Sequence, residues 1–194
     1  MEFVDGKTIR MDKELNELDN FVIEFLKIIE KHAKYVVVSG YIPILFGRSR
    51  ATEDVDVFIE ELTREKFLAL FSELDESGWR CINTENSKEM FAYLDDNTAI
   101  RFAKKGEVIP NMEVKFARKN FDRHTMEDSV KVIIGKNIVF IPSIEEQIVF
   151  KKIILGSDKD KEDARHLEEI FKDMLDKSKL SKLEKAVRSG EHEF

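Results

Sequence analysis

The chain has little cysteine, little proline and no long apolar run. Cys81 is the single cysteine, which excludes an intrachain disulfide framework and a cysteine-rich zinc site and favours a reducing compartment. Free cysteine is usually buried, so we expect Cys81 and the nearby Trp79 to lie in the core. No apolar stretch is long enough to cross a membrane, and the N-terminus lacks the charged-then-apolar pattern of a secretion signal. We therefore expect a cytoplasmic protein without membrane contact.

Charge is abundant but is not gathered into blocks of one sign. Of the 194 residues, 37% are charged and 42% are hydrophobic, which is enough apolar material for one large domain or two small ones. The net charge of -7 is spread along the chain, so no polybasic arm indicates a nucleic-acid partner. A local basic surface formed by the basic residues from Lys115 to Arg123, with Arg48 and Arg50, stays an open alternative.

Apolar periodicity predicts alternating helices and strands over the first 141 residues. Helical spacing covers 12–32 and 63–74, and a short helix over 41–46 follows Gly40 directly. Runs rich in β-branched and aromatic residues predict strands at 35–39, 54–59, 79–82, 99–103 and 112–116. Residues 130–134 and 138–141 flank a glycine turn and predict a hairpin.

After Pro142 the pattern becomes helical. Ser143 and Glu146 form a capping-box sequence before a helix that should end near Gly156, and further helices are expected over 160–175 and 179–187. Asp160 and Asp163 lie in the first turns of the second helix, where acids favour the helix dipole, so a structural role explains them. We predict a sheet-bearing domain at 1–141 and a helical subdomain at 142–194, although two packed halves of one domain fit equally well.

Two aspartates one residue apart are the most informative feature of the chain. On a strand, Asp54 and Asp56 point to the same face, while Val55 and Val57 point to the opposite, buried face. Two like charges side by side repel each other unless a proton or a cation intervenes. The pair therefore predicts a divalent cation site more readily than a solvated strand edge.

The turn Ser39-Gly40-Tyr41, the short helix after it and Asp54-Val55-Asp56 together resemble the polymerase-beta-like nucleotidyltransferase superfamily. The segment from Glu145 to Asp163 is similar to the tail of small bacterial and archaeal nucleotidyltransferases, including abortive-infection toxins of toxin–antitoxin pairs. The resemblance spans about 36–171. It implies an α+β fold in which a mixed β-sheet with flanking helices is followed by a small helical part.

The resemblance also implies a site. Asp54, Asp56 and a third carboxylate would be the catalytic metal ligands for two Mg²⁺ ions, with Mn²⁺ as a substitute, beside a nucleoside triphosphate such as ATP. Glu113 on a later strand is the best match for the third acid, although an acid there also fits ordinary alternation on a half-exposed strand. The residues expected to bind nucleotide are Ser39, Gly40, Arg48, Arg50 and Lys151.

The implied activity is magnesium-dependent transfer of a nucleoside monophosphate to a hydroxyl on a small molecule, a protein or tRNA. Glu113 replaces the usual aspartate, and, depending on the register, Tyr41 replaces the family's second small residue or Ser39 replaces its first glycine. A catalytically silent nucleotide- or partner-binding module on the same fold therefore stays open. A toxin-type transferase acting on tRNA is a third reading, for which the basic residues around Lys119 are the only hint. The four histidines show no metal-ligand spacing.

Overall fold

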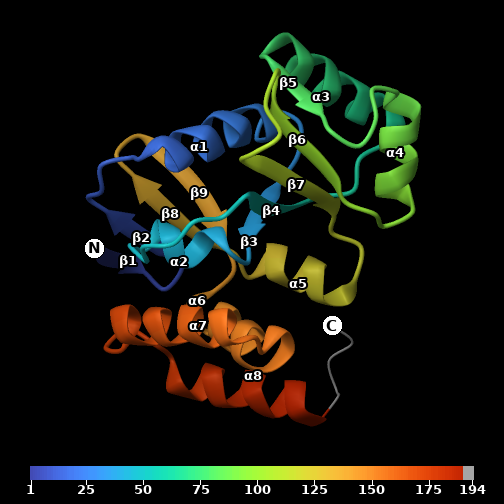
Figure 1. The fold of residues 1–194 in the computed structure, drawn as a ribbon. Helices are drawn as coiled ribbons and strands as arrows, with labels where there is room; N and C mark the ends of the chain where they lie inside the picture. Colours follow the sequence, from blue (N-terminus) through green and yellow to red (C-terminus); the bar gives the residue numbers. More distant parts are fainter. Residues whose placement is uncertain (190–194) are drawn as a thin grey trace.

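The computed structural model describes residues 1–189 and arranges their strands in two mixed sheets (Figure 1). The five-stranded sheet has the order β3-β4-β7-β6-β5, with β4 and β7 parallel and the other neighbours antiparallel. Its strands are β3 (Tyr35–Val38), β4 (Asp54–Ile59), β5 (Trp79–Cys81), β6 (Ile100–Lys104) and β7 (Asn111–Phe116). The α+β class and the mixed strand directions expected from the sequence are confirmed, with two sheets in place of one.

The second sheet has four strands in the order β1-β2-β8-β9. These strands are β1 (Glu2–Asp5), β2 (Thr8–Met11), β8 (Val130–Ile134) and β9 (Asn137–Ile141). The predicted hairpin is β8 and β9, paired antiparallel from Val130↔Ile141 to Ile134↔Asn137. The two sheets meet where Tyr35 of β3 donates its hydroxyl to the Ile138 carbonyl at 3.2 Å, so strand β3 links both layers.

The core is built around helix α1 (Glu17–Ile29). Asn16 caps its start by accepting from the backbone N–H of Asp19 at 2.8 Å, so the helix begins five residues later than the apolar pattern alone indicated. Its buried face reaches Trp79, whose ring centroid lies 4.8 Å from that of Phe25. Trp79 and Cys81 are 0% and 4% exposed, which confirms the core position expected for both.

Helix α3 (Arg64–Glu76), predicted from the sequence, lies with α4 (Ser87–Asp95) at the β5–β6 side of the molecule (Figure 1). Strands β1 and β2 and helices α4 and α5 (Asn120–Glu127) were not expected from the sequence. The two strands have four residues each, and α4 and α5 each bury only two side chains. Elements with so little buried surface leave a weak periodic signal.

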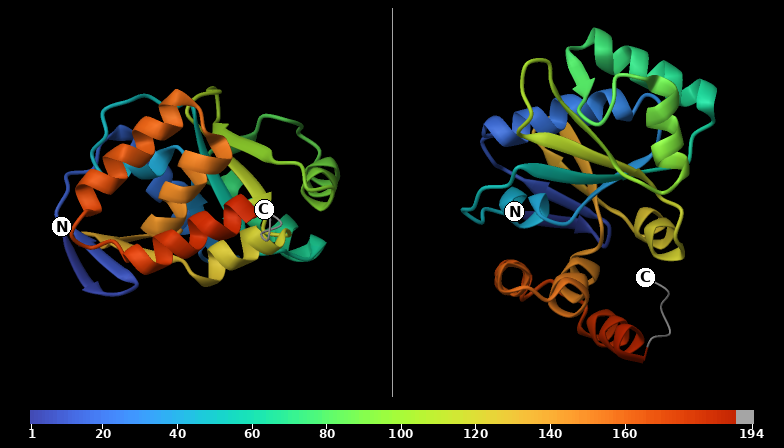
Figure 2. Two further views of the ribbon diagram at one scale, coloured as in Figure 1. Left: turned by 90° about the horizontal axis from the view of Figure 1, so that it is seen from below. Right: turned by 45° about the vertical axis from the view of Figure 1, so that its right-hand side comes forward.

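The C-terminal helices lie together beneath the sheets (Figures 1 and 2). They are α6 (Ile144–Val149), the π-helical segment η1 (Phe150–Leu155), α7 (Asp158–Phe171) and α8 (Lys177–Ser189). The helix predicted to end near Gly156 does so, because Gly156 takes the left-handed backbone conformation at φ 66°. The domain division at residue 142 remains a prediction, and its last five residues lie outside the described range. Within 1–189, no helix combines the length and the apolar character needed to cross a bilayer.

Candidate active site

Strand pairing sets the three predicted metal ligands on one face of the five-stranded sheet. In the parallel register of β4 and β7, Asp56 is paired with Glu113. Neighbouring strands are about 4.8 Å apart, so paired residues present their side chains next to each other on the same face. Val55 and Val57 are 0% and 1% exposed on the opposite face, as alternation along the strand predicts.

The electrostatics of Asp56 reflect this crowding. The pKa of Asp56 is raised from 3.8 to about 6, first by burial and then by the negative charges of Glu113 and Asp54. A hydrogen bond from the Ser39 side chain and the positive charge of Lys151 act against the increase. A half-buried carboxyl with two acidic neighbours is a group that a bound cation would stabilise.

Glu113 has a partner that the sequence did not reveal. Arg101 Nη2 lies 2.5 Å from Glu113 Oε2, and the antiparallel register of β6 and β7 pairs these two residues directly. The side chain of Arg101 is 47% exposed, so the pair is at the surface of the sheet. Only the register of the two strands identifies this contact, and the register cannot be read from one sequence.

Asp54 is exposed and is oriented by the loop before β4. Thr52 Oγ1 donates to the Asp54 backbone carbonyl at 2.9 Å and lies 3.3 Å from Asp54 Oδ1. Thr52 therefore closes the turn that leads into the strand and touches one of the two carboxylate oxygens. It was not among the residues that we selected from the sequence.

The turn before the short helix α2 (Tyr41–Leu45) is shaped by neighbouring side chains. Ser39 is in the left-handed region at φ 62°, a conformation that glycine favours and serine rarely adopts. A Cβ at Gly40 would lie 2.8 Å from Arg50 Nη2, which donates to the Gly40 carbonyl at 2.7 Å. Glycine at position 40 thus permits the approach of Arg50, and Tyr41 is buried with its hydroxyl donating to Asp19 at 2.7 Å.

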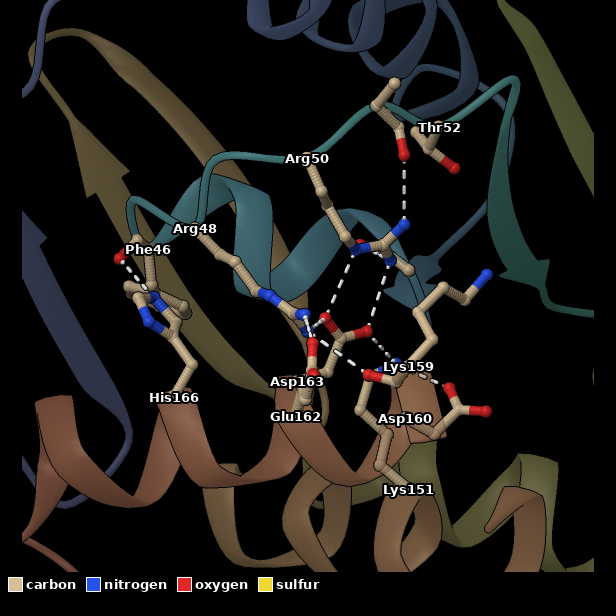
Figure 3. Close-up of polar contacts among 12 residues, drawn as sticks. Phe46, Arg48, Arg50, Thr52, Lys151, Lys159, Asp160, Glu162, Asp163 and His166 are labelled. Carbon is tan, nitrogen blue, oxygen red and sulfur yellow. Dashed lines mark hydrogen bonds and ion pairs between the residues drawn. The ribbon is translucent and has the colours of Figure 1, made fainter. Parts of the chain in front are cut away.

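The three cations expected to bind nucleotide converge on one carboxylate of α7 (Figure 3). Asp163 is fully buried and accepts from Lys151 Nζ at 2.8 Å and from Arg50 Nε and Nη2 at 3.2 Å. Arg48 Nη1 also contacts Asp163, and Arg48 Nη2 lies 2.6 Å from Glu162. We call Arg48, Arg50, Lys151 and Asp163 the Asp163 cluster. Their predicted contact with nucleotide stays a prediction.

Asp160 lies in the first turn of α7, as expected for an acid that favours the helix dipole, whereas the structural role of Asp163 has a different physical basis. Ser157 caps α7 by accepting from the Asp160 backbone N–H at 3.2 Å, and Lys151 Nζ lies 3.3 Å from the Asp160 carboxylate. Asp163 does not cap the helix; it neutralises three buried or half-buried cations. Lys159 extends away from these carboxylates (Figure 3).

A different set of side chains comes close enough to share one metal ion. Within residues 1–189, His124, Asp128 and Glu146 are the group whose possible ligand atoms all lie within 4.8 Å of one another. His124 and Asp128 are in and just after α5, and Glu146 is in α6. This group is distinct from Asp54, Asp56 and Glu113, and it includes a histidine for which the sequence indicated no metal role.

Solved structures share this fold, although no protein-family model and no curated protein matches the sequence. An antigenic nucleotidyltransferase-like protein from Paracoccidioides brasiliensis is 16% identical, with a TM-score of 0.50 over 88% of this chain and 86% of that one. The antibiotic-resistance factor ANT(2'')-Ia is 14% identical, with a TM-score of 0.53 over 88% and 90% of the two chains. At these identities the likeness concerns the fold. The chain therefore has the nucleotidyltransferase-like fold that its motifs resembled.

Proposed function

We propose that the chain is a magnesium-dependent nucleotidyltransferase that moves a nucleoside monophosphate from a nucleoside triphosphate to a hydroxyl acceptor. The observation that carries the proposal is the pairing of Asp56 with Glu113 across two parallel strands, with Asp54 on the same face. The donor set consists of carboxylate oxygens, which Mg²⁺ prefers. Three acids on one face are costly for folding without a cation, and the raised pKa of Asp56 is consistent with that cost.

Each acid would have its own task. Asp54 and Asp56 would hold both ions, and Glu113 would complete the second ion's coordination and help to remove the proton of the acceptor hydroxyl. The ions would neutralise charge on the α-phosphate and on the departing pyrophosphate. Ser39 already donates to Asp56 and would orient that carboxylate, and the backbone N–H groups of the Gly40 turn would face the terminal phosphates.

Pyrophosphate release tests the proposal directly. With each of the four nucleoside triphosphates and Mg²⁺, the wild-type chain should release pyrophosphate, and Asp56→Asn should lower the rate by roughly 100-fold or more, equivalent to about 3 kcal/mol. Glu113→Gln should have a comparable effect. Asp96→Asn, an exposed acid at the end of α4, is the matched control and should leave the rate unchanged.

The acceptor is unidentified, so a binding measurement accompanies the rate. A fluorescent non-hydrolysable triphosphate should bind the wild type only when Mg²⁺ is present and should not bind Asp56→Asn. If the wild type neither turns over nor binds triphosphate in a metal-dependent way, the proposal is wrong.

The second candidate is a catalytically silent nucleotide- or partner-binding module, favoured by the ion pair between Glu113 and Arg101. A carboxylate that forms an ion pair with an arginine does not coordinate a second metal ion. Triphosphate binding that persists in Glu113→Gln, together with undetectable pyrophosphate from the wild type, would select this candidate.

The basic residues around Lys119, which were the only sequence hint of a tRNA acceptor, give that acceptor little support in the folded chain. Arg118 Nη2 lies 2.6 Å from both Glu61 and Asp95, so its charge is already neutralised by neighbouring acids. The pyrophosphate-release assay therefore includes small-molecule, protein and RNA acceptors.

A further inference from the structure

The group formed by His124, Asp128 and Glu146 lies where α5 meets α6. His124 and Asp128 are four residues apart at the end of α5 and so share one side of the helix, and the Asp128 N–H donates to the His124 carbonyl at 2.9 Å. Glu146 approaches from α6, the first helix of the C-terminal part. Lys179 of α8 lies 2.5 Å from Asp128, so a side chain of the last helix also reaches the group.

Glu146 supplies an independent indication that a ligand belongs here. Its residue exposure is 4%, and Thr125 Oγ1 donates to its Oε1, but the buried Oε2 has no hydrogen-bond partner. An unpaired buried carboxylate oxygen is costly, by roughly 1–3 kcal/mol or more. The Ser143–Glu146 capping box is only half formed: Ser143 accepts from the Glu146 N–H at 3.4 Å, while the Glu146 side chain turns to α5. A cation would satisfy the free oxygen.

The donor types specify the class of cation. One imidazole nitrogen and two carboxylate oxygens suit Zn²⁺ and similar transition ions, whereas Mg²⁺ and Ca²⁺ prefer oxygen ligands alone. Ligand atoms around a tetrahedral zinc ion lie about 3.3 Å apart, so atoms now within 4.8 Å need to close by at most roughly 1.5 Å. His124 is exposed, and Asp128 follows the last turn of α5, so both side chains have room to move.

Two lysines compete with the ion at Asp128. Lys7 Nζ lies 3.2 Å from Oδ1 and Lys179 Nζ lies 2.5 Å from Oδ2, with side chains 61% and 33% exposed. An ionised carboxylate has about four lone-pair sites, so each oxygen keeps one that no lysine occupies. The ammonium charges would weaken cation binding without blocking it.

We propose that His124, Asp128 and Glu146 form a transition-metal site of the zinc type, which ties α5 to α6 and is separate from the predicted magnesium site. The bound ion would hold the helix that follows β7 against the first C-terminal helix. Because none of its ligands belongs to the acidic strand face, the site would stand whether or not the chain is a nucleotidyltransferase.

Zinc binding to the full chain tests this proposal. The starting protein carries Asp54→Asn and Asp56→Asn, which remove the acidic pair as a competing site. Calorimetric titration with Zn²⁺ should give one ion per chain, and Zn²⁺ should raise the unfolding temperature. His124→Gln should weaken binding by at least about tenfold and abolish the rise in unfolding temperature. With Co²⁺ as a spectroscopic probe, the visible absorption of a bound ion should disappear in the same variant.

Further variants make the result specific. Glu146→Gln keeps the oxygen that Thr125 contacts and should also lose the ion, whereas His32→Gln, at a histidine paired with Glu73, is the matched control and should bind normally. Lys179→Met removes a competing ammonium and should tighten binding severalfold. If His124→Gln, an exposed position that tolerates substitution, binds Zn²⁺ as the starting protein does, or if the starting protein binds none, the proposal is overturned.

Discussion

At the residue scale, the ionised form of Asp56 lowers the free energy of unfolding. Its pKa is about 6 in the folded chain against 3.8 as a free side chain, so the folded state holds the proton more tightly. Stability therefore falls as pH rises through the window from about 4 to 6, and the cost persists above it. Raising the pKa from 3.8 to about 6 corresponds to about 3 kcal/mol, which partial exposure of the side chain reduces to roughly 2 kcal/mol.

Asp56→Asn should therefore stabilise the chain at neutral pH while it removes the proposed activity. We expect the unfolding temperature to rise by about 4–8 °C at pH 8 and to be nearly unchanged at pH 4, because the wild-type carboxyl is then protonated. Thermal unfolding at the two pH values, without added metal, measures this. Asp54→Asn, at an exposed position, should give a smaller gain, and an equal gain at both pH values would contradict the electrostatic explanation.

Arg101 is expected to compete with metal for Glu113. Arg101→Gln should tighten Mg²⁺ binding severalfold, because the carboxylate is then free to reach an ion, and the effect should vanish when Glu113→Gln is also present. Calorimetric Mg²⁺ titration of the two single variants and the double variant measures the coupling. An identical gain in the double variant would mean that Arg101 acts by general repulsion instead.

The acids could be selected from the sequence, but their partners could not. Alternation along a strand places Asp54 and Asp56 on one face, and the family resemblance pointed to Glu113. Thr52 and Arg101 have no comparable local signal, since they become neighbours of these acids only through a turn geometry and a strand register. The group around His124 has little local signal, because only Asp128 lies four residues away and Glu146 comes from another helix.

At the element scale, the Asp163 cluster fastens the loop between α2 and β4 to helix α7. Arg48 and Arg50 lie in that loop, Lys151 lies in η1, and all three contact the buried Asp163 carboxylate. Lys151 is 1% exposed, so it depends on the carboxylates of Asp163 and Asp160 for neutralisation. The same loop ends at Asp54, and the cluster therefore positions the start of the acidic strand.

Replacing Asp163 should be strongly destabilising. Asp163→Asn leaves three cations without their shared counter-charge, and we expect the free energy of unfolding in urea to fall by about 3–5 kcal/mol. Glu162→Gln, at a side chain that is 57% exposed and pairs with Arg48, is the control and should cost less than about 1 kcal/mol. Similar losses in both variants would show that Asp163 is not the centre of the cluster.

The elements themselves were predictable where burial is periodic. Helices α1, α3 and α7 and strands β3, β4 and β7 carry apolar residues at the spacing of their structure, and the sequence located each of them. Strand β2 pairs with β8, which lies more than 100 residues away, and β1 pairs only with β2, so the second sheet could not be recognised from these four-residue strands by themselves. The π-helical turn of η1 likewise has no periodic signature that separates it from an α-helix.

At the scale of the whole molecule, the fold brings the acidic strand face and the C-terminal helices together through long-range contacts. Lys151, from the helical part, lies near enough to Asp56 to lower its pKa, so both parts contribute to the electrostatics of the site. The fold could be anticipated from three motifs in order, whereas the acceptor could not, because acceptor sites are built from loops that vary independently of the catalytic strands.

The measurement that bears most directly on the central claim is anomalous scattering from Mn²⁺ in crystals grown with a non-hydrolysable nucleoside triphosphate. We predict that Mn²⁺ lies between the carboxylates of Asp54, Asp56 and Glu113, with Glu113 released from Arg101 and the triphosphate against the ions. Triphosphate and Mn²⁺ bound elsewhere, with the Glu113–Arg101 pair intact, would contradict the account.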